Sequence, residues 1–226
     1  MDNMLGMFTF PPLLTELVFG FGAVRGIGQR VKALGGSKAL VVTDPGVKQA
    51  GLLKQVEDAL NLEAVHYAVY AEVPQDSSTT TIAEALASLN SEGCDIVIGL
   101  GGGSSMDTAK AVAISKTNPG SIEDYAGLEK LRVAPLPVIA VPTTAGTGSE
   151  VSYWSVMTDD RTGLKISVGG KMVFPEVAIC DPDLTMSLPP GLTASTGMDA
   201  LTHAIESFVN NATQPVSKAL SLRAIE

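Results

Sequence analysis

A glycine-rich turn near the middle of the chain carries the residues best suited to binding a charged ligand. The short apolar run 96–100 predicts a strand buried on both faces, three glycines follow at 101–103, and a helical pattern containing Ser104 and Asp107 comes next. Glycines let backbone N–H groups approach an anion, and the first turn of a helix adds unpaired donors and the positive end of its dipole. We therefore predict a phosphate-binding turn; the alternative is a plain strand–helix connection in which Ser104 and Asp107 form a capping box.

A second polar loop, at 143–149, follows another predicted strand at 137–141. Its threonine, serine and glycine residues supply small hydroxyl groups and accessible backbone groups. Because ligands bind outside the carboxyl ends of the strands in open α/β sheets, the two loops can close over one extended ligand. The alternative is an ordinary polar loop.

Asp44 directly follows the predicted strand 38–43. A carboxylate at a strand end can accept hydrogen bonds from an adenosine ribose and repel a 2′-phosphate, which favours NAD over NADP. The local sequence is equally consistent with a turn aspartate that precedes Pro45.

Asp199 and His203 are four residues apart in a predicted helix, so their side chains share one face. A carboxylate and an imidazole placed in this way can bind one divalent metal; the alternatives are a surface ion pair and a buried structural histidine. The other histidine, His66, lies in a predicted strand and is expected to be structural or exposed. The chain by itself therefore cannot supply two histidines to one metal.

The remaining pattern is that of an α/β chain. Apolar runs predict strands at 15–19, 38–43, 64–69, 96–100, 137–141 and 177–180, and a hairpin at 154–158 and 165–167. Helices are predicted at 23–34, from 47 to about 60 after a turn at 44–46, at 79–90 and at 106–115. These repeated units predict a mostly parallel, Rossmann-like sheet with helices on both faces. After residue 184 only helical patterns are present, so we divide the chain into an α/β domain, 1–183, and the start of an all-α domain, 184–226.

Composition narrows the classes of function. The chain has 226 residues, 45% of them hydrophobic, and a formal net charge of −9. Its basic residues are thinly spread, so neither nucleic-acid nor membrane binding is expected, and no apolar run has the length of a transmembrane helix. The first twelve residues, which have the pattern of an arm, lack the basic region of a signal peptide. Cys94 and Cys180 lie in apolar surroundings typical of reduced thiols, so we expect a cytoplasmic protein.

One motif points to a different class of enzyme. Gly22, Gly26 and Gly28 match the GxxxGxG pattern of short-chain dehydrogenases. Those enzymes also need Tyr-x-x-x-Lys as their catalytic pair, and no tyrosine of this chain has a lysine four residues later. The standard GxGxxG dinucleotide motif is absent as well, so the short-chain class is disfavoured.

Taken together, the motifs resemble those of the iron-containing (group III) alcohol dehydrogenases over nearly the whole chain. The segments that carry the resemblance are FGFGAV at 19–24, TDPGV at 43–47, GGGSSMDTAKA at 101–111, VPTTAGTGSEVS at 141–152, CDPDL at 180–184 and GMDALTHAIE at 197–206, with Lys165 after the hairpin turn.

The resemblance implies a dehydroquinate synthase-like architecture, in which an α/β dinucleotide domain and a helical domain enclose a divalent metal, iron or zinc. It implies hydride transfer between NAD and a small alcohol or aldehyde, with the metal as Lewis acid. The residues that it places at the cofactor are Asp44, Gly102, Gly103, Ser104, Asp107, Thr143, Thr144, Thr147, Ser152, Val156 and Lys165. Asp199 and His203 would be metal ligands, and no further catalytic residue is predicted.

The resemblance also implies two further histidine ligands downstream of Glu226. We therefore expect a truncated chain, or a fragment of a longer gene product, that alone binds metal weakly and turns over alcohols negligibly. A glycerol dehydrogenase-like member of the same superfamily and a nucleotide-binding module without catalysis remain alternatives. Family relatives often dimerise through N-terminal segments, so a homodimer through the segment from Leu14 to Phe21 is a further expectation.

Overall fold

The structure is a computed structural model that describes residues 14–211 and 214–226; the predicted arm at residues 1–12 lies outside the described residues. The first half of the chain runs through β1 (Glu16–Phe19), the 3-10 helix η1 (Ala23–Gly26), α1 (Ile27–Ala33), β2 (Lys38–Val42), α2 (Pro45–Gln49), α3 (Leu52–Leu62), β3 (His66–Tyr70), α4 (Thr79–Glu92), β4 (Ile96–Gly101) and α5 (Gly103–Thr117). The second half runs through η2 (Ile122–Tyr125), β5 (Gly127–Leu128), β6 (Val138–Pro142), η3 (Ser149–Val151), β7 (Trp154–Asp159), β8 (Leu164–Gly169), η4 (Lys171–Val173), β9 (Val177–Cys180), η5 (Pro182–Thr185), α6 (Pro190–Val209) and α7 (Pro215–Ile225).

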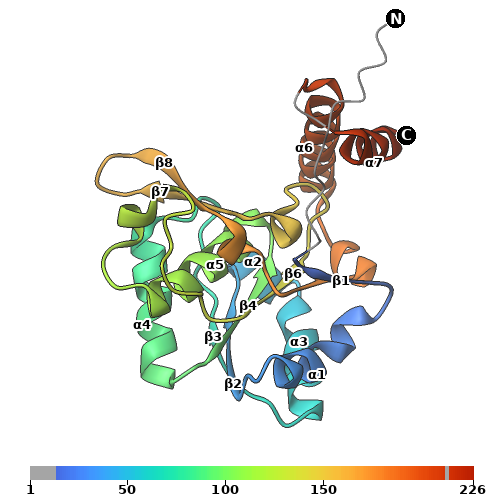
Figure 1. Ribbon diagram of the computed structural model, residues 1–226. Helices are drawn as coiled ribbons and strands as arrows, with labels where there is room; N and C mark the ends of the chain where they lie inside the picture. Colours follow the sequence, from blue (N-terminus) through green and yellow to red (C-terminus); the bar gives the residue numbers. More distant parts are fainter. Residues whose placement is uncertain (1–13, 212–213) are drawn as a thin grey trace, which may run out of the picture.

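Six parallel strands form the main sheet, in the order β1-β9-β6-β4-β2-β3 (Figure 1). This arrangement confirms the predicted α/β fold with a mostly parallel sheet. The chain moves outward from β2 to β3 and then returns to the far side of β2, where it forms β4. Helices on either side of such a reversal leave a crevice at the carboxyl ends of β2 and β4, which is where ligands bind in this class of fold.

Alternating side chains on the central strands build one apolar core on each face of the sheet. On β2, Ala39 and Val41 belong to the core under α1 and α3, whereas Leu40 and Val42 belong to the core under α4 and α5. All four are 0% exposed, as expected for a parallel strand covered on both faces. The two helical layers therefore fix the strand ends, and with them the loops that follow those strands.

The predicted hairpin is confirmed as β7 and β8, which pair antiparallel from Trp154↔Gly169 to Asp159↔Leu164. Its β8 strand also pairs in parallel with the short β5, so the three form a second sheet. The hairpin turn contacts the main domain, because the Asp160 carboxylate accepts a hydrogen bond from the Thr80 N–H at 2.8 Å, in the first turn of α4. The hairpin is thereby held beside the carboxyl edge of the main sheet.

Two predicted helix boundaries differ from the structure. The helix expected after the turn at 44–46, from 47 to about 60, already begins at Pro45 and is divided into α2 and α3, because Gly51 adopts a left-handed conformation with φ +77°. The helix expected at 106–115 begins earlier, at Gly103, so Ser104 lies inside α5 and does not cap it.

Two helices, α6 and α7, pack on each other and project from the sheet domain (Figure 1). Many of their apolar side chains are exposed, among them Met198 (61%), Val209 (65%) and Leu220 (65%). Among residues 14–211 and 214–226, no helix combines the length and the apolar character needed to span a bilayer. The division of the chain at residue 183 stays a prediction.

Candidate functional site

A cavity of about 950 Å³ opens at the carboxyl edge of the sheet, over the crevice between β2 and β4. One wall consists of the connections that follow β2, β3, β4 and β6. Another part of the lining is largely apolar and comes from the segment between η5 and the first turn of α6: Leu184, Ser187, Leu188, Pro189 and Leu192. Ligand pockets commonly measure about 300–1,000 Å³, so this cavity can hold a large, extended molecule.

The three glycines of the 101–103 turn differ in how much space each leaves for a side chain. Gly101 has φ +146°, and a Cβ there would lie 2.6 Å from Ser105 Oγ and 2.9 Å from Asp44 Oδ2. A Cβ on Gly103 would lie 3.0 Å from Thr147 Cγ2. The nearest atom to a Cβ on Gly102 is 3.7 Å away, on Thr144. Close packing therefore demands glycine at 101 and disfavours a side chain at 103, whereas Gly102 leaves open backbone at the cavity wall.

The start of α5 presents unpaired donors to the cavity. Gly102 is the N-cap residue, it makes no side-chain cap, and the first turn holds no acidic residue. The N–H groups of Gly103, Ser104 and Ser105 consequently have no partner within the helix, and all three residues line the cavity. A helix start of this kind attracts an anion through both its donors and its dipole.

The alternative capping-box interpretation of Ser104 and Asp107 is wrong. The Ser104 hydroxyl donates to the Gln75 carbonyl instead. The Asp107 carboxylate accepts hydrogen bonds from the Ser149 hydroxyl at 2.6 Å and from the Val156 N–H at 3.1 Å. Ser104 and Asp107 therefore bond to residues distant in the sequence and do not form the reciprocal bonds of a capping box.

Asp44 combines the two roles proposed from the sequence. Its Oδ1 accepts a hydrogen bond from the Val47 N–H at 3.0 Å, so it caps the short helix α2 as a turn aspartate does. Its Oδ2 accepts from the Ser105 hydroxyl at 3.2 Å, which ties the end of β2 to the start of α5. The residue is only half-buried and lines the cavity, so its carboxylate remains available to a ligand hydroxyl.

The threonine-rich loop meets the glycine turn directly. The Thr143 N–H donates to the Gly101 carbonyl at 3.0 Å, and Thr143 and Thr144 both line the cavity. The Thr144 hydroxyl oxygen is buried and has no hydrogen-bond partner within the described part of the chain. Farther along, a Cβ on Gly146 would lie 2.7 Å from the Thr196 carbonyl, so the loop also packs tightly on α6. The two loops expected to close over one ligand thus border the same cavity.

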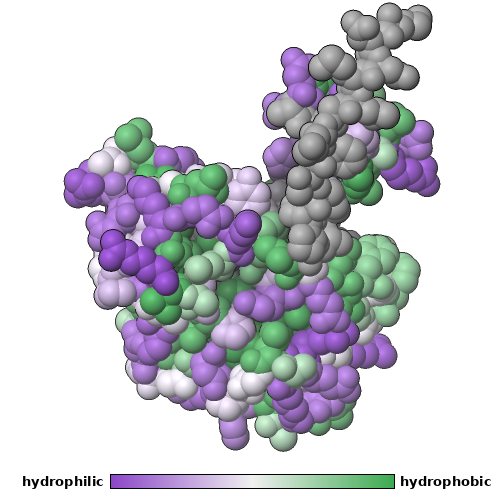
Figure 2. Space-filling model, in the orientation of Figure 1, coloured by the Kyte–Doolittle hydropathy of each residue, from purple (hydrophilic) through white to green (hydrophobic). Residues whose placement is uncertain are grey.

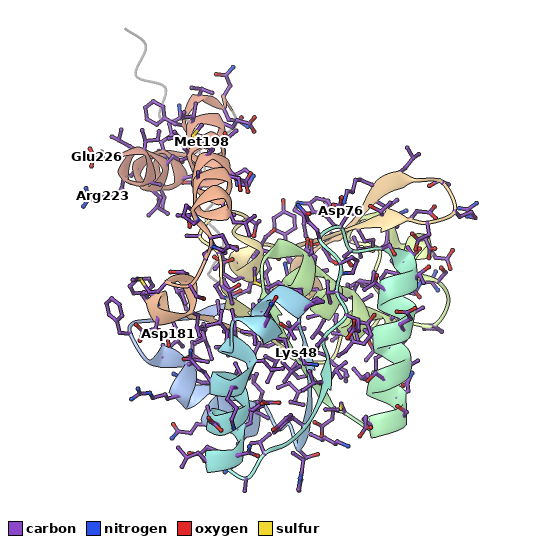
Figure 3. All side chains as sticks on the ribbon, turned by 180° about the vertical axis from the view of Figure 1, so that it is seen from behind. Lys48, Asp76, Asp181, Met198, Arg223 and Glu226 are labelled. Atoms are coloured by element: carbon purple, nitrogen blue, oxygen red, sulfur yellow. The ribbon has the colours of Figure 1, made fainter. Side chains whose placement is uncertain are left out.

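Five of the predicted cofactor residues lie outside the cavity wall: Asp107, Thr147, Ser152, Val156 and Lys165. Thr147 touches the turn through Gly103, and Val156 is held by Asp107. Lys165 forms an exposed ion pair with Asp76 at 2.7 Å, and Figure 3 shows Asp76 where the β3–α4 connection meets the hairpin. The neighbouring residue, Gln75, lines the cavity, so this pair borders its rim.

A buried lysine that the sequence did not single out connects these parts. Lys110 is 1% exposed, and its ammonium group lies 2.9 Å from Ser149 Oγ, 3.2 Å from the Ser152 carbonyl and 2.8 Å from the Trp154 carbonyl. It also lies 3.4 Å from an Asp107 oxygen. One side chain thereby joins α5, η3 and β7, and holds the threonine-rich loop in place behind the cavity.

Burial governs the charges in this region. It lowers the pKa of Lys110 against the opposing attraction of Asp107, and it raises the pKa of the Glu150 carboxyl. Burial, with a smaller contribution from Glu150, raises the pKa of the Cys180 thiol to about 11. Cys94 is buried and Cys180 is half-buried, and both are free thiols.

Asp199 and His203 lie side by side on α6, as their spacing predicts. The Asp199 Oδ1 and His203 Nε2 atoms are 3.8 Å apart, and the side chains are 43% and 58% exposed. Within the described residues, no group of three or more histidine, cysteine, aspartate or glutamate side chains is placed to hold a metal ion. Because catalytic zinc sites use three protein ligands, these residues fit only part of a metal site.

Comparison with known proteins identifies the family. The family model described as "Iron-containing alcohol dehydrogenase" matches residues 14–182, and the model of its C-terminal part matches residues 193–226. The chain is 40% identical to choline dehydrogenase of Bacillus subtilis, covering 100% of this chain and 56% of that protein. It is 39% identical to the NAD-dependent methanol dehydrogenase of Bacillus methanolicus, and the match covers 97% of this chain and 57% of that protein.

Solved structures agree with these sequence matches. A 1,3-propanediol oxidoreductase superposes with a TM-score of 0.92 at 37% identity, over 96% of this chain and 57% of that one. Sulfoacetaldehyde reductase from Bifidobacterium kashiwanohense, in complex with NAD+, gives a TM-score of 0.90 at 35% identity, over 97% and 58%. The chain thus spans a little over half the length of the relatives it matches. These matches confirm the resemblance: the chain belongs to the iron-containing alcohol dehydrogenase family.

Proposed function

We propose that this chain is the dinucleotide-binding part of an NAD-dependent, metal-dependent alcohol dehydrogenase that interconverts primary alcohols and aldehydes. The observation that carries the proposal is the single cavity on which the open backbone of Gly102, the free N–H groups of α5, Thr144 and Asp44 converge. A relative of the same fold in complex with NAD+ supports it.

The residues present fit a dinucleotide. The N–H groups at the start of α5 would bind the pyrophosphate, because they have no partner within the helix and lie at its positive end. The buried Thr144 hydroxyl gains a hydrogen-bond partner when a polar ligand fills the cavity. Asp44 would accept hydrogen bonds from the adenosine ribose, which favours NAD over NADP. The nicotinamide ring of the bound cofactor would supply hydride transfer to and from the carbinol carbon.

Fluorescence titration of NADH, combined with an assay on short alcohols, tests this proposal. Saturable NADH binding that NAD+ displaces is the expected result. Binding with turnover supports the dehydrogenase. Binding without turnover fits a truncated dehydrogenase, and it also fits a second candidate, a nucleotide-binding module without catalysis, which the incomplete metal site of the described residues favours. Absence of both binding and turnover would contradict both candidates.

We further propose that Asp199 and His203 are two ligands of an Fe²⁺ or Zn²⁺ site whose other ligands lie outside the described residues. Two exposed ligands on one helix bind a divalent ion weakly, so the 226-residue chain is expected to retain less than one metal per chain after gel filtration. Elemental mass spectrometry of the eluted protein measures this, with the Asp199→Asn/His203→Asn variant as control. Stoichiometric metal in the wild-type chain would contradict a site that needs ligands outside the described residues, and measurable metal retained equally by the variant would contradict the roles of Asp199 and His203.

The sheet edge supports the proposed homodimer. Among the described residues, β1 pairs only with β9, and its outward-facing Leu17 and Phe19 are 56% and 75% exposed. Apolar surface is visible in Figure 2 below the projecting helices, where β1 and η5 lie in Figure 1. An open edge strand with apolar side chains is a template for pairing with a second copy.

The variant Leu17→Lys/Phe19→Lys is therefore expected to convert a dimer into a monomer while leaving NADH affinity unchanged. Lysines on an edge strand oppose edge-to-edge pairing, and β1 contributes nothing to the cavity wall. Size-exclusion chromatography with light scattering measures the mass. A monomeric wild-type chain, or a variant that stays dimeric, would disprove this interface.

A further inference from the structure

Two acidic residues occupy corresponding positions at the ends of neighbouring strands. Val42 of β2 pairs with Tyr70 of β3, and Asp44 and Glu72 each lie two residues beyond that pair. The backbone pairing continues past both strands, because the Thr43 N–H donates to the Tyr70 carbonyl at 2.9 Å and the Val73 N–H donates to the Thr43 carbonyl at 3.2 Å. Adjacent strands lie about 4.8 Å apart, so the two acids are neighbours, and both line the cavity.

The two carboxylates differ in how they are held. Asp44 is fixed by the hydrogen bonds from Val47 and Ser105. Glu72 is exposed and makes neither a hydrogen bond nor an ion pair with any described residue. The negative charge of Glu72 is therefore uncompensated and free to act on a ligand at the rim.

The cavity wall provides no cation to oppose these charges. Within the described residues, its lining contains Asp44 and Glu72 but no lysine, arginine or histidine. Lys48 of α2, labelled in Figure 3, is exposed and is not among the lining residues. A 2′-phosphate carries a charge of about −1.5 to −2 at neutral pH and usually requires an arginine or lysine partner.

We propose that Glu72 is a second cofactor-selecting residue, which acts with Asp44 to exclude dinucleotides that carry a 2′-phosphate. This role of Glu72 rests on the proposed dinucleotide binding. It adds a second residue to the selection of NAD over NADP that Asp44 was proposed to make alone. Glu72 adds charge repulsion at the strand end next to the ribose position, and because it is not engaged elsewhere it can be neutralised without removing a structural contact.

Paired titrations of NADH and NADPH test the role of Glu72. Glu72→Gln is expected to tighten NADPH binding about threefold and to leave NADH binding within about twofold, since one rim charge acts through partly screened solvent. Glu72→Lys is expected to tighten NADPH binding about tenfold. The matched control is Glu57→Gln on α3, which removes the same charge from a residue outside the cavity and should leave the NADH/NADPH ratio unchanged.

The outcomes separate this inference from the proposed function. If the wild-type chain binds NADH but Glu72→Gln leaves the NADH/NADPH ratio unchanged, Glu72 is not a selecting residue and the dinucleotide site stands. If Glu57→Gln changes the ratio as much as Glu72→Gln does, the selection comes from overall charge, and the inference is overturned. If the wild-type chain binds neither cofactor, the proposed function itself fails.

Discussion

Replacing Lys110 by methionine is expected to lower the free energy of unfolding by about 3–5 kcal/mol. The substitution removes the ammonium group that donates to the Ser149 hydroxyl and to the Ser152 and Trp154 carbonyls, and it leaves the Asp107 carboxylate without its buried cation. NADH affinity should fall as well, because the threonine-rich loop loses the group that joins it to α5. Urea unfolding followed by circular dichroism measures the stability.

The matched control for this prediction is Lys116→Met on the same helix. Lys116 is exposed and its ammonium group contacts only Asn90 among the described residues, so its replacement should change stability by no more than about 0.5 kcal/mol. An unfolding midpoint of Lys110→Met equal to that of the control would show that the buried lysine does not hold these elements together.

The stability difference between the wild-type chain and Lys110→Met should also depend on pH, and the burial of Lys110 fixes the direction of the change. Burial lowers the pKa of Lys110 in the folded state below its ordinary value of 10.5. Between these two pKa values the unfolded chain binds more protons than the folded chain, so the contribution of Lys110 to stability increases as the pH rises. The stability difference between wild type and Lys110→Met should therefore widen toward pH 10.5. A difference that narrows over this range would contradict the buried, desolvated state of the ammonium group.

Gly101→Ala is expected to abolish NADH binding and to lower the free energy of unfolding by about 2–5 kcal/mol. The residue has φ +146°, which side chains rarely adopt, and the new methyl group would lie 2.6 Å from Ser105 Oγ and 2.9 Å from Asp44 Oδ2. Relief of these contacts must displace either the start of α5 or the end of β2, and both border the cavity.

Gly102→Ala is the matched control, because it places the same methyl group one residue later. Gly102 has an ordinary φ of −78°, and the nearest atom to its Cβ is 3.7 Å away. Stability should therefore stay within about 1 kcal/mol of wild type, while NADH affinity falls because the methyl group covers backbone that faces the ligand. NADH binding by Gly102→Ala at wild-type affinity would show that the dinucleotide does not lie over this turn.

The alternation of strands and helices was predictable because the central strands are buried on both faces. The apolar stretches 39–42 and 96–100 have that composition for this reason, and each lies in a parallel strand. The break at Gly51 was not predictable from the pattern, since apolar positions continue through it and a single glycine is tolerated in a helix. Only the backbone conformation reveals it.

The parts of the candidate site that are loops after strands were predictable from the sequence. The roles of side chains whose partners are distant in the sequence were much less so. The convergence of the glycine turn, the threonine-rich loop and Asp44 follows from parallel strands ending at one edge. The roles of Ser104 and Asp107 did not follow from their capping-box spacing, because Gln75 and Ser149 lie outside any local window. Lys110 was missed because lysine is rarely buried; its only signal was the run of small and apolar residues around it, which indicates a helix covered on all sides.

A crystal structure of this chain grown with NAD+ tests the central claim most directly. The pyrophosphate should lie over the backbone of Gly102 to Ser104, with the Thr144 hydroxyl hydrogen-bonded to the ligand and the adenosine ribose against Asp44. A nucleotide bound elsewhere on the molecule, with the cavity between β2 and β4 left open, would contradict the proposed function.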